Sequence, residues 1–598
     1  MSEGKFAVAD VRWAITRLHQ IILKHLYLPL MSISTKTPNV YEDFEVEKNV
    51  AIPMRDGVKL YADIYKPQVK GKFPVILTRL PYGKDEFYCE MPVIGKYWAK
   101  KGYIFVAQDV RGKWNSEGEW YSCYSSKGVK NEANDGYDTI DYVAKQPWCN
   151  GNIGMFGVSY YGSTQWAVAP LNHPNLKCIA PGTTATDIYG IKIYNNGAFC
   201  MQTMGEWEYT MNSRKNNNSL RLNPWHLPLI TMDDETGVTC DCYKDWIRHP
   251  SRDSYWDQIS HSKYDQIKIP VLHWGGWYDV YLKATIDDWL GVRENSKSSV
   301  AMDNQWLVIG PIDHEWTTDG THKIGKMDIG EKGCNWIWSL HEQFFDYWLK
   351  GIDNGFSEIP RVKIFVLGDN EWRYENEWPL ARTKYISYYF HSKGSANTLD
   401  GDGTMNTSKP SDEPYDSYLY DPTNPVAISL ECDLWSLALT IKNRVSVEKR
   451  SDVLVYTTPE LNEDTEITGP IKVTLFASSS ARDTDFTATL VDVFPSGYAH
   501  MIQEGILRAR YRNSDRSPSL IEPGKIYKYT IDLWATSFVV KKGHKIRVEI
   551  SSSNFNRYDR NTNTGHEFGM DDETAKATQT IYHDKKRPSH ITLPLILR

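Results

Sequence analysis

Short, wholly apolar runs alternate with helix-like segments in the first half of the chain, and this alternation limits the fold more than any other feature. The apolar runs predict strands over residues 73–80, 104–110, 153–158, 269–279 and 305–311. Helical patterns cover residues 93–103, 134–148, 160–170, 281–292 and 336–352. Strands that are apolar on both faces are typical of parallel sheets covered by helices on both sides. The sequence therefore predicts an α/β domain with a doubly wound sheet.

Local signals add detail to this prediction. Residues 50–67 read as two strands joined by a turn at residues 55–57. We expect Asn134 or Asp135 to cap the helix over residues 134–148, because both side chains accept hydrogen bonds from the first turn of a helix.

The chain of 598 residues is too long for a single hydrophobic core, so we expect several domains. The alternation is interrupted by a Trp-, Tyr- and Asn-rich segment with helix-like stretches, which predicts a helical cap over the carboxyl ends of the strands. Helical periodicity disappears after residue 351, and alternating segments then predict an antiparallel sandwich, most simply a jelly roll. The predicted parts are an N-terminal helical extension (1–38), an α/β domain in two pieces (39–183 and 263–352), a helical cap (184–262) and a C-terminal jelly roll (353–598).

The N-terminal extension carries an amphipathic helix pattern over residues 11–28. Arg12, Arg17 and Lys24 interrupt its apolar face and Pro29 ends it, so the segment is too short and too charged to span a bilayer. Docking on the body of the protein, pairing with a second copy in a homo-oligomer and lying on a membrane surface remain open for it.

The net charge bears on the class of binding partner, and the cysteines bear on metal binding and cellular location. A net charge of −7 argues against nucleic acid as the main partner, because such a partner favours a concentrated basic face. The nine cysteines are scattered, without a CxxC pair or a matched histidine cluster, so we expect no metal site. Reduced thiols are typical of a cytoplasmic protein, which is the predicted location.

One strand-turn-helix stretch, "GNIGMFGVSYYGSTQW" over residues 151–166, surrounds Ser159 with small residues. An α/β hydrolase places its nucleophile on such a turn, where backbone and helix approach closely. Gly157 fits the usual G-x-S-x-G pattern, but Tyr161 stands where the second glycine belongs and Gly162 follows it. Ser159 is therefore either part of an ordinary tight turn or a nucleophile.

Two later strand ends carry the partners that a nucleophilic serine requires. Asp279 comes at the carboxyl end of the strand over residues 269–279, and His314 follows the strand over residues 305–311. The order Ser, Asp, His is that of an α/β hydrolase, in which histidine acts as the base and aspartate orients it. Individually, Asp279 reads equally well as a helix N-cap and His314 as an exposed loop histidine. Together with Ser159 they favour a catalytic triad.

Other polar residues near these motifs are expected to have structural roles. We expect His273 to be packed inside its strand, and we interpret Asp109 and Arg111 as a structural pair that shapes a loop beside the site. An oxyanion hole should use the backbone N–H of Tyr160 and a second donor from the loop after an early strand. Tyr82 lies in that loop, but spacing alone favours a turn with a packed ring.

Several segments resemble the CocE/NonD hydrolases, a family of esterases, acylases and Xaa-Pro dipeptidyl-peptidases. They include "LTRLPYGK", "QDVRGKWNSEGEW", "GVSYYGSTQW", "HWGGWYD", "IGPIDHEW" and "GHKIRVEISSSNFNRYDRNTNTG", and they extend from about residue 50 almost to the C-terminus. The family pattern G-x-S-Y-x-G is satisfied. The resemblance implies Ser159 as nucleophile, His314 as base, Asp279 as its orienting acid, and Tyr82 with the Tyr160 amide as the oxyanion hole. It also implies a hydrolase domain, a helical cap and a C-terminal jelly roll.

One departure from the family bears on the substrate. α-Amino-acid ester hydrolases carry acidic residues just after the triad aspartate, whereas here Asp279 is followed by residues 280–282, Val-Tyr-Leu. We therefore expect a neutral or aromatic acyl group rather than a free α-ammonium. Trp166, Trp274 and Trp277 are candidate walls of the pocket, and each reads equally well as buried core.

The sequence thus predicts a serine hydrolase that cleaves small-molecule esters or amides through an acyl-enzyme, without a metal or an organic cofactor. A Xaa-Pro dipeptidyl-peptidase is the first alternative, although no anionic subsite for a peptide N-terminus can be located. A non-catalytic carbohydrate- or protein-binding homologue is the second alternative.

Overall fold

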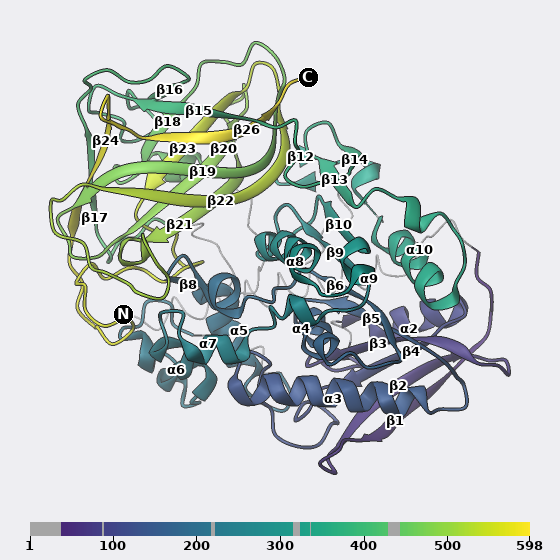
Figure 1. Ribbon diagram of the computed structural model, residues 1–598. Coiled ribbons are helices and arrows are strands. Elements are labelled where there is room, and N and C mark those ends of the chain that lie inside the picture. The colour runs from purple at the N-terminus through teal and green to yellow at the C-terminus, as the bar shows by residue number, and fades with distance from the viewer. Residues whose placement is uncertain (1–37, 87–88, 217–221, 315–322, 335, 428–442) are drawn as a thin grey trace.

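The computed structural model describes residues 38–598 apart from 87–88, 217–221, 315–322, 335 and 428–442. The predicted N-terminal helix therefore lies outside the described residues. An α/β domain and an all-β domain lie side by side, and short helices from the middle of the chain adjoin both (Figure 1).

The first domain is built on a ten-stranded sheet with the order β1-β2-β4-β3-β5-β6-β9-β10-β13-β14. The neighbours from β4 to β13 are parallel, and β1, β2 and β14 add antiparallel edges. Parallel strands that are buried on both faces confirm the predicted α/β class. The strands are β1 Phe44–Pro53, β2 Lys59–Pro67, β3 Phe73–Leu80, β4 Ile104–Asp109, β5 Cys149–Val158, β6 Leu176–Gly182, β9 Val271–Gly276, β10 Gln305–Gly310, β13 Val362–Val366 and β14 Glu371–Glu375.

Helices cover both faces of this sheet, as the alternation in the sequence predicts. On β3, Ile76 joins the core beneath α2 and α10, whereas Val75 and Leu77 join the core beneath α3, α4 and α8. β3 thus contributes apolar side chains to two cores. The helices are α2 Met91–Lys100, α3 Ser126–Ala144, α4 Ser159–Val168, α8 Leu282–Asn295, α9 Ser299–Asp303 and α10 Trp336–Lys350.

The start of α3 corrects one prediction. The Ser125 side chain caps this helix by accepting a hydrogen bond from the Gly128 N–H (3.1 Å), so Asn134 and Asp135 lie inside the helix instead of at its N-terminus. The polar first turns of α3 hid the beginning of the helix, because its apolar periodicity starts later than its hydrogen bonds do.

Short helices lie between β6 and β9, in the segment for which the sequence predicts a cap. Two of them are π-helices, η3 Ile188–Ile193 and η4 Met201–Gly205, and the others include α5 Glu206–Met211, α6 Asp241–Arg248 and α7 Ser254–Ile259. The cap also touches the second domain: Arg252 pairs with Asp515 (2.7 Å), and the Phe199 N–H donates to Asp559 (2.7 Å).

The second domain is all β, as predicted. A sheet of twelve strands runs β17-β24-β19-β26-β15-β16-β18-β23-β20-β21, with β22 paired to β19 and β25 to β24. Phe486 of β20 packs on Tyr529 of β22 with ring centroids 4.8 Å apart, so two layers face each other across one core. The strands are β15 Lys384–His391, β16 Thr404–Asn406, β17 Asp416–Tyr420, β18 Leu454–Thr457, β19 Thr465–Ser479, β20 Asp485–Val493, β21 Ala499–Arg508, β22 Tyr527–Val540, β23 Lys545–Ser551, β24 Ala577–Asp584, β25 Arg587–Pro588 and β26 His590–Ile596.

The first sheet continues past the predicted boundary at residue 352. β13 pairs in parallel with β10, and β14 pairs with β13, so both belong to the α/β domain. Their alternating pattern resembles that of the second domain, which is why the sequence places the change of texture too early.

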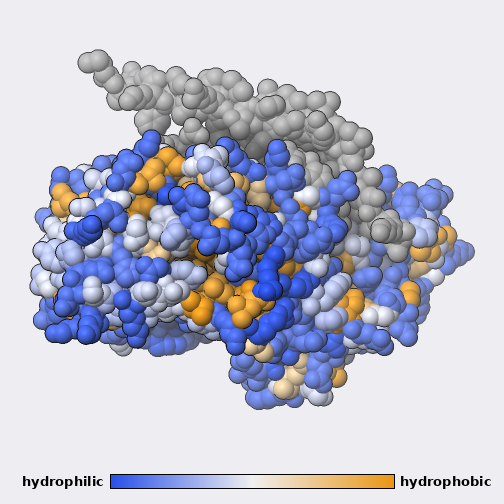
Figure 2. All heavy atoms as spheres, turned by 90° about the horizontal axis from the view of Figure 1, so that it is seen from above, coloured by the Kyte–Doolittle hydropathy of each residue, from blue (hydrophilic) through white to orange (hydrophobic). Residues whose placement is uncertain are grey.

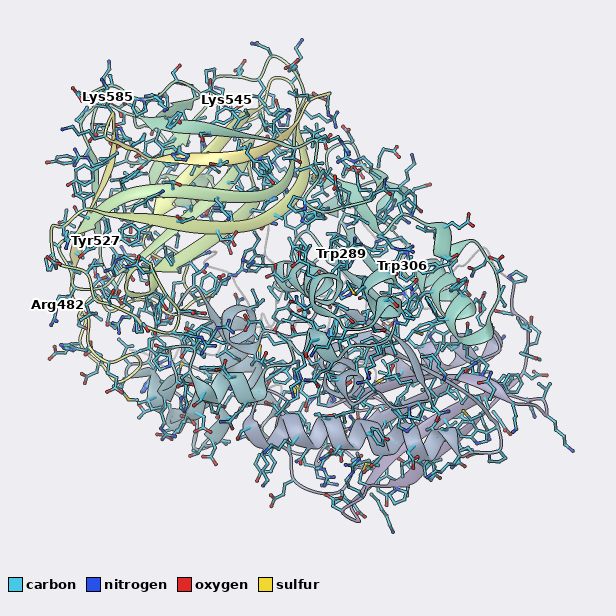
Figure 3. All side chains as sticks on the ribbon, viewed as in Figure 1. Trp289, Trp306, Arg482, Tyr527, Lys545 and Lys585 are labelled. Atoms are coloured by element: carbon cyan, nitrogen blue, oxygen red, sulfur yellow. The ribbon has the colours of Figure 1, made fainter. Side chains whose placement is uncertain are left out.

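Many of the tryptophan, tyrosine and phenylalanine side chains are buried in the hydrophobic cores of the two domains. Figure 3 places Trp289 on α8 and Trp306 on β10 within the α/β domain, and both side chains are buried. On the face drawn in Figure 2, hydrophobic side chains form small groups among hydrophilic ones. No helix in the described part of the chain has the length and apolarity that a bilayer crossing requires.

Candidate active site

The turn between β5 and α4 holds Ser159 in a backbone conformation that side chains other than glycine rarely adopt, with φ of 53°. Close packing explains the small residues around it. A Cβ on Gly157 would lie 2.2 Å from the Tyr161 ring, and a Cβ on Gly162 would lie 2.8 Å from the Thr184 side chain. The pattern G-x-S-Y-x-G therefore lets the helix approach the strand while the half-buried serine hydroxyl points out of the turn.

The structure brings together the three side chains that the sequence proposes as a triad. The Ser159 hydroxyl lies 3.0 Å from Nε2 of His314, and Nδ1 of His314 lies 2.8 Å from Oδ1 of Asp279. His314 and Asp279 are buried, with 7% and 0% of their surfaces exposed. The three residues follow β5, β10 and β9 respectively, so the carboxyl edge of the parallel sheet positions all of them.

The loop that carries Asp279 is held from the second domain. Gln503 of β21 donates to the Trp277 carbonyl (2.8 Å), and the Tyr278 hydroxyl contacts Nε2 of His500 (3.1 Å). Asp279 does not cap α8, because the N-cap position belongs to Tyr281. Its carboxylate is thus available to His314.

Tyr82 lies at the other side of Ser159. Its hydroxyl is hydrogen-bonded to the Ser159 side chain and accepts a hydrogen bond from Nε1 of Trp207 in α5 (3.1 Å). Burial raises the pKa of Tyr82, so its hydroxyl keeps its proton and can donate it to an oxyanion. The structure therefore places the phenol beside the serine rather than in a remote turn.

Tyr160, the residue after Ser159, has a fully buried ring that anchors the turn. Its hydroxyl donates to Glu132 of α3 (2.9 Å) and accepts from the Cys123 N–H (3.0 Å). Glu132 also pairs with the buried Arg79 (2.8 Å). These contacts fix the direction of the Tyr160 backbone N–H at the start of α4.

The three tryptophans proposed as pocket walls are core residues. Trp166 is buried against His273 in the core beneath α3, α4 and α8. Trp274 packs on His341 of α10 on the opposite face of the sheet, and Trp277 donates to the Phe365 carbonyl of β13. Each occupies an apolar interior that a large ring fills well, and this corrects the prediction.

The proposed pairing of Asp109 with Arg111 is also wrong. Asp109 accepts from the Lys84 backbone (2.8 Å) and pairs with its ammonium (3.1 Å), whereas Arg111 pairs with Asp135 (2.7 Å) and Asp56 (2.8 Å). The partners come from other elements, which sequence proximity does not reveal.

His273 is packed in its strand as expected. Its Nε2 lies 2.8 Å from the Gln305 side chain, and burial lowers the pKa of His273 to about 4.

Four further residues around Ser159, Asp279 and His314 were not predicted from the sequence. The Tyr281 ring packs edge-on against His314 (5.2 Å), and the Lys192 ammonium lies over the Tyr281 ring (4.3 Å). Tyr124 packs on Trp207 (5.5 Å). Lys192 and Trp207 come from the cap, where no periodic pattern marks a pocket.

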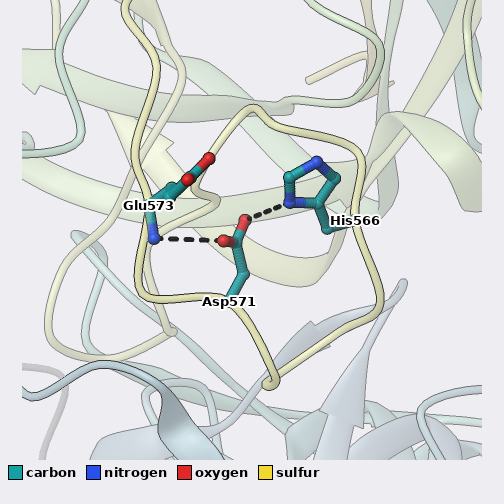
Figure 4. A group of neighbouring side chains, drawn as sticks. All are labelled: His566, Asp571 and Glu573. Atoms are coloured by element: carbon teal, nitrogen blue, oxygen red, sulfur yellow. Dashed lines mark hydrogen bonds and ion pairs between the residues drawn. The ribbon is translucent and has the colours of Figure 1, made fainter.

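A cluster of side chains with metal-ligating atoms lies far along the chain from Ser159, Asp279 and His314. His566, Asp571 and Glu573 gather in one loop of the second domain between β23 and β24 (Figure 4). The Asp571 carboxylate is already used within the loop, because it accepts from the Glu573 N–H (3.0 Å) and pairs with His566 (3.2 Å). The group is therefore a hydrogen-bonded loop, and no catalytic role follows from it.

Comparisons with known proteins cover both domains. The family described as X-Pro dipeptidyl-peptidase (S15 family) matches residues 56–316, and that described as X-Pro dipeptidyl-peptidase C-terminal non-catalytic domain matches residues 354–592. The chain is 36% identical to the cocaine esterase of Rhodococcus sp. (strain MB1 Bresler), over 93% of this chain and 99% of that protein.

Two solved structures have the same architecture. An aminopeptidase from the marine sediment archaeon Thaumarchaeota archaeon superposes with a TM-score of 0.82 at 26% identity, covering 94% of this chain and 99% of that one. An α-amino acid ester hydrolase gives a TM-score of 0.80 at 25% identity, covering 94% and 98%. Since the similarity to the esterase extends over nearly the whole of both proteins, the chain belongs to the CocE/NonD family of serine hydrolases.

Proposed function

We propose that Ser159, His314 and Asp279 form the catalytic triad of an esterase that acts on small molecules. One observation carries the proposal: the Ser159 hydroxyl, the His314 ring and the Asp279 carboxylate are hydrogen-bonded in series, with distances of 3.0 and 2.8 Å. In this arrangement Nε2 of His314 takes the proton of Ser159 as its oxygen attacks the acyl carbon. Asp279 fixes the tautomer of His314 and stabilises the imidazolium that forms.

The negative charge that develops on the carbonyl oxygen requires donors that are already oriented. We assign this role to the Tyr82 hydroxyl and the Tyr160 backbone N–H. The hydrogen bond from Trp207 to Tyr82 supports the assignment, because it leaves the proton of the phenol free to point at the substrate. The strained turn at Ser159 supports it as well, since it presents the hydroxyl and the following N–H to the same side.

The second half of the reaction reverses these roles. His314 gives its proton to the leaving group, which departs and leaves Ser159 acylated. His314 then removes a proton from water, the water oxygen attacks the acyl carbon, and Ser159 regains its proton as the acid is released. These residues perform every proton transfer, so we expect no metal or organic cofactor to be required.

Esters are the preferred substrates in this proposal, because the identity of 36% is to a protein named as an esterase. A Xaa-Pro dipeptidyl-peptidase is the alternative that the name of the matching family raises. Comparing 4-nitrophenyl acetate with a Xaa-Pro 4-nitroanilide separates the two, since a peptidase would cleave the anilide, whereas an esterase would cleave the activated acetate ester and leave the anilide intact.

Replacing Ser159 by alanine tests the triad. We expect kcat for 4-nitrophenyl acetate to fall by roughly a million-fold and labelling by a fluorophosphonate to disappear. Ser126→Ala, at an exposed serine on α3, is the matched control and should keep both properties. Turnover in Ser159→Ala that equals the control would refute the proposal.

A homo-oligomer and a cytoplasmic location remain predictions. Light scattering of the full chain and fractionation of its host would test them.

A further inference from the structure

A buried lysine stands beside the proposed triad, and the reaction described above does not use it. Lys192 lies near the end of the π-helix η3 in the cap, with 1% of its surface exposed. π-Helical turns are energetically unfavourable and occur frequently at functional sites. The fold thus accepts an irregular helix and the burial of a cation at the same position.

The charge of Lys192 has no carboxylate partner within the described residues. Its ammonium donates one hydrogen bond, to the Tyr124 hydroxyl (3.0 Å), and lies over the rings of Tyr124 (4.6 Å) and Tyr281 (4.3 Å). Two of its three N–H groups therefore have no acceptor in the part of the chain that the structure describes. Burying a cation without an anion is costly, because the rings replace only part of the lost hydration.

The pKa of Lys192 reflects this environment. Burial lowers the pKa to about 8, against the opposing influence of Cys123, Asp279 and Asp288. The ammonium form still predominates at pH 7, so the site offers a positive charge under ordinary conditions.

Two chains of contacts connect Lys192 to the reacting atoms. The Tyr281 ring separates it from His314, which packs on that ring with centroids 5.2 Å apart. The Tyr124 ring separates it from Trp207 (5.5 Å), which donates to the Tyr82 hydroxyl. Lys192 is thus one aromatic ring away from the histidine and from the residue that holds the proposed oxyanion donor.

We propose that Lys192 determines specificity by binding a carboxylate on the substrate, so that the enzyme prefers esters or amides that carry an anionic group near the reacting carbonyl. This inference rests on the function proposed for Ser159. A substrate carboxylate would supply the two missing acceptors and the missing counter-charge in one step. The same cation would repel the ammonium of a peptide N-terminus, which disfavours a dipeptidyl-peptidase.

Paired substrates test the proposal. On the acyl side, 4-nitrophenyl monoesters of adipic and terephthalic acid are compared with the matching carboxamides, which have the same shape without the charge. On the leaving-group side, the acetate ester of 4-hydroxybenzoic acid is compared with that of 4-hydroxybenzamide. The measured quantity is the ratio of kcat/KM within each pair, which does not depend on the fraction of active enzyme.

We expect the carboxylate to be favoured in at least one pair by roughly 10- to 100-fold, the range for a hydrogen bond to a charged group. Lys192→Met should bring that ratio to one or below, whereas Lys192→Arg should keep part of it. Lys263→Met, at an exposed lysine near the end of the cap, is the matched control and should keep the ratio of the unaltered enzyme. The pair that responds identifies which side of the substrate carries the anion.

Ratios near one in every pair, or a preference that survives Lys192→Met, would overturn the inference. If Lys192→Met does not fold, the ratios of the unaltered enzyme still decide, together with competitive inhibition by benzoate against benzamide, in which equal inhibition counts against the proposal. Failure of the proposed function gives a different result, because then neither member of a pair would be hydrolysed in a way that depends on Ser159.

Discussion

Tyr82→Phe removes one hydroxyl from the proposed oxyanion hole and leaves the ring in place. The Tyr82 hydroxyl is buried beside Ser159, and Trp207 donates to it (3.1 Å). Removal of one donor of this kind costs about 10²- to 10³-fold in kcat, or about 3–4 kcal/mol of transition-state stabilisation. We expect that loss in kcat with little change in KM, because the donor acts on charge that develops only in the transition state.

Trp207→Phe tests the reason for this arrangement. Its indole N–H acts only through Tyr82, so losing it should cost the net value of one hydrogen bond, about 0.5–1.5 kcal/mol, or roughly 2- to 13-fold in kcat. In a Tyr82→Phe background the same change should have almost no effect, because the acceptor is already absent. The coupling energy between the two positions should therefore be about as large as the single effect of Trp207→Phe.

The assay is hydrolysis of 4-nitrophenyl acetate by the four enzymes of this cycle, with active sites counted by fluorophosphonate labelling. Trp225→Phe, at a half-exposed tryptophan of the same cap, is the matched control. Full kcat in Tyr82→Phe would refute the role of the phenol. Equal losses from Trp207→Phe in both backgrounds would refute the idea that Trp207 acts through it.

Three further outcomes are expected. Gly162→Ala should destabilise the protein by about 1–3 kcal/mol and lower kcat, because the new Cβ would lie 2.8 Å from the Thr184 side chain; denaturant unfolding and esterase assays measure both, and wild-type stability would contradict the packing argument. Glu132→Gln should cost about 3–5 kcal/mol through the buried arginine that it leaves unpaired, whereas Tyr160→Phe should cost only about 1 kcal/mol; unfolding curves that rank them in the opposite order would contradict this. The pKa of His273 falls from 6.5 in the unfolded chain to about 4 in the folded one, so the unfolded state takes up a proton first and stability falls as the pH drops below about 6.5. Between pH 7 and pH 5 the free energy of unfolding of His273→Gln should therefore fall by about 2 kcal/mol less than that of the unaltered protein. The same pH dependence in both proteins would count against this prediction.

The sequence was most informative where chemistry coincides with regular structure. Strand ends in a parallel sheet meet at one edge, so the positions of Ser159, Asp279 and His314 after three predicted strands were enough to expect their convergence. Glycine spacing was informative for a related reason, because close contact between α4 and the chain at the end of β6 leaves no room for a Cβ at residue 162. The all-β domain was predictable from alternation alone.

The surroundings of the proposed triad could not be predicted in the same way. Trp207 and Lys192 lie in a cap of short and π-helical segments, which have no period that reports burial or direction. The three tryptophans next to the motifs were wrongly expected to line a pocket. A large ring that is close to a motif in the chain can still point to the opposite face of a strand and fill the core, as Trp274 does. Ion pairs between distant segments could not be predicted either, because nothing in the sequence shows which segments lie side by side. The pair between Asp109 and Lys84 is an example.

Two residues directly before Asp279 are hydrogen-bonded to β21. The Trp277 carbonyl accepts from Gln503, and the Tyr278 hydroxyl contacts His500. The acid that orients the proposed base thus lies on a loop whose hydrogen-bond partners in β21 are 222 and 226 residues further along the chain. An engineer who exchanges the C-terminal half with that of a relative would therefore be altering the alignment of the imidazole as well as a distant accessory. Chimeras should be cut so that this loop and β21 come from the same parent.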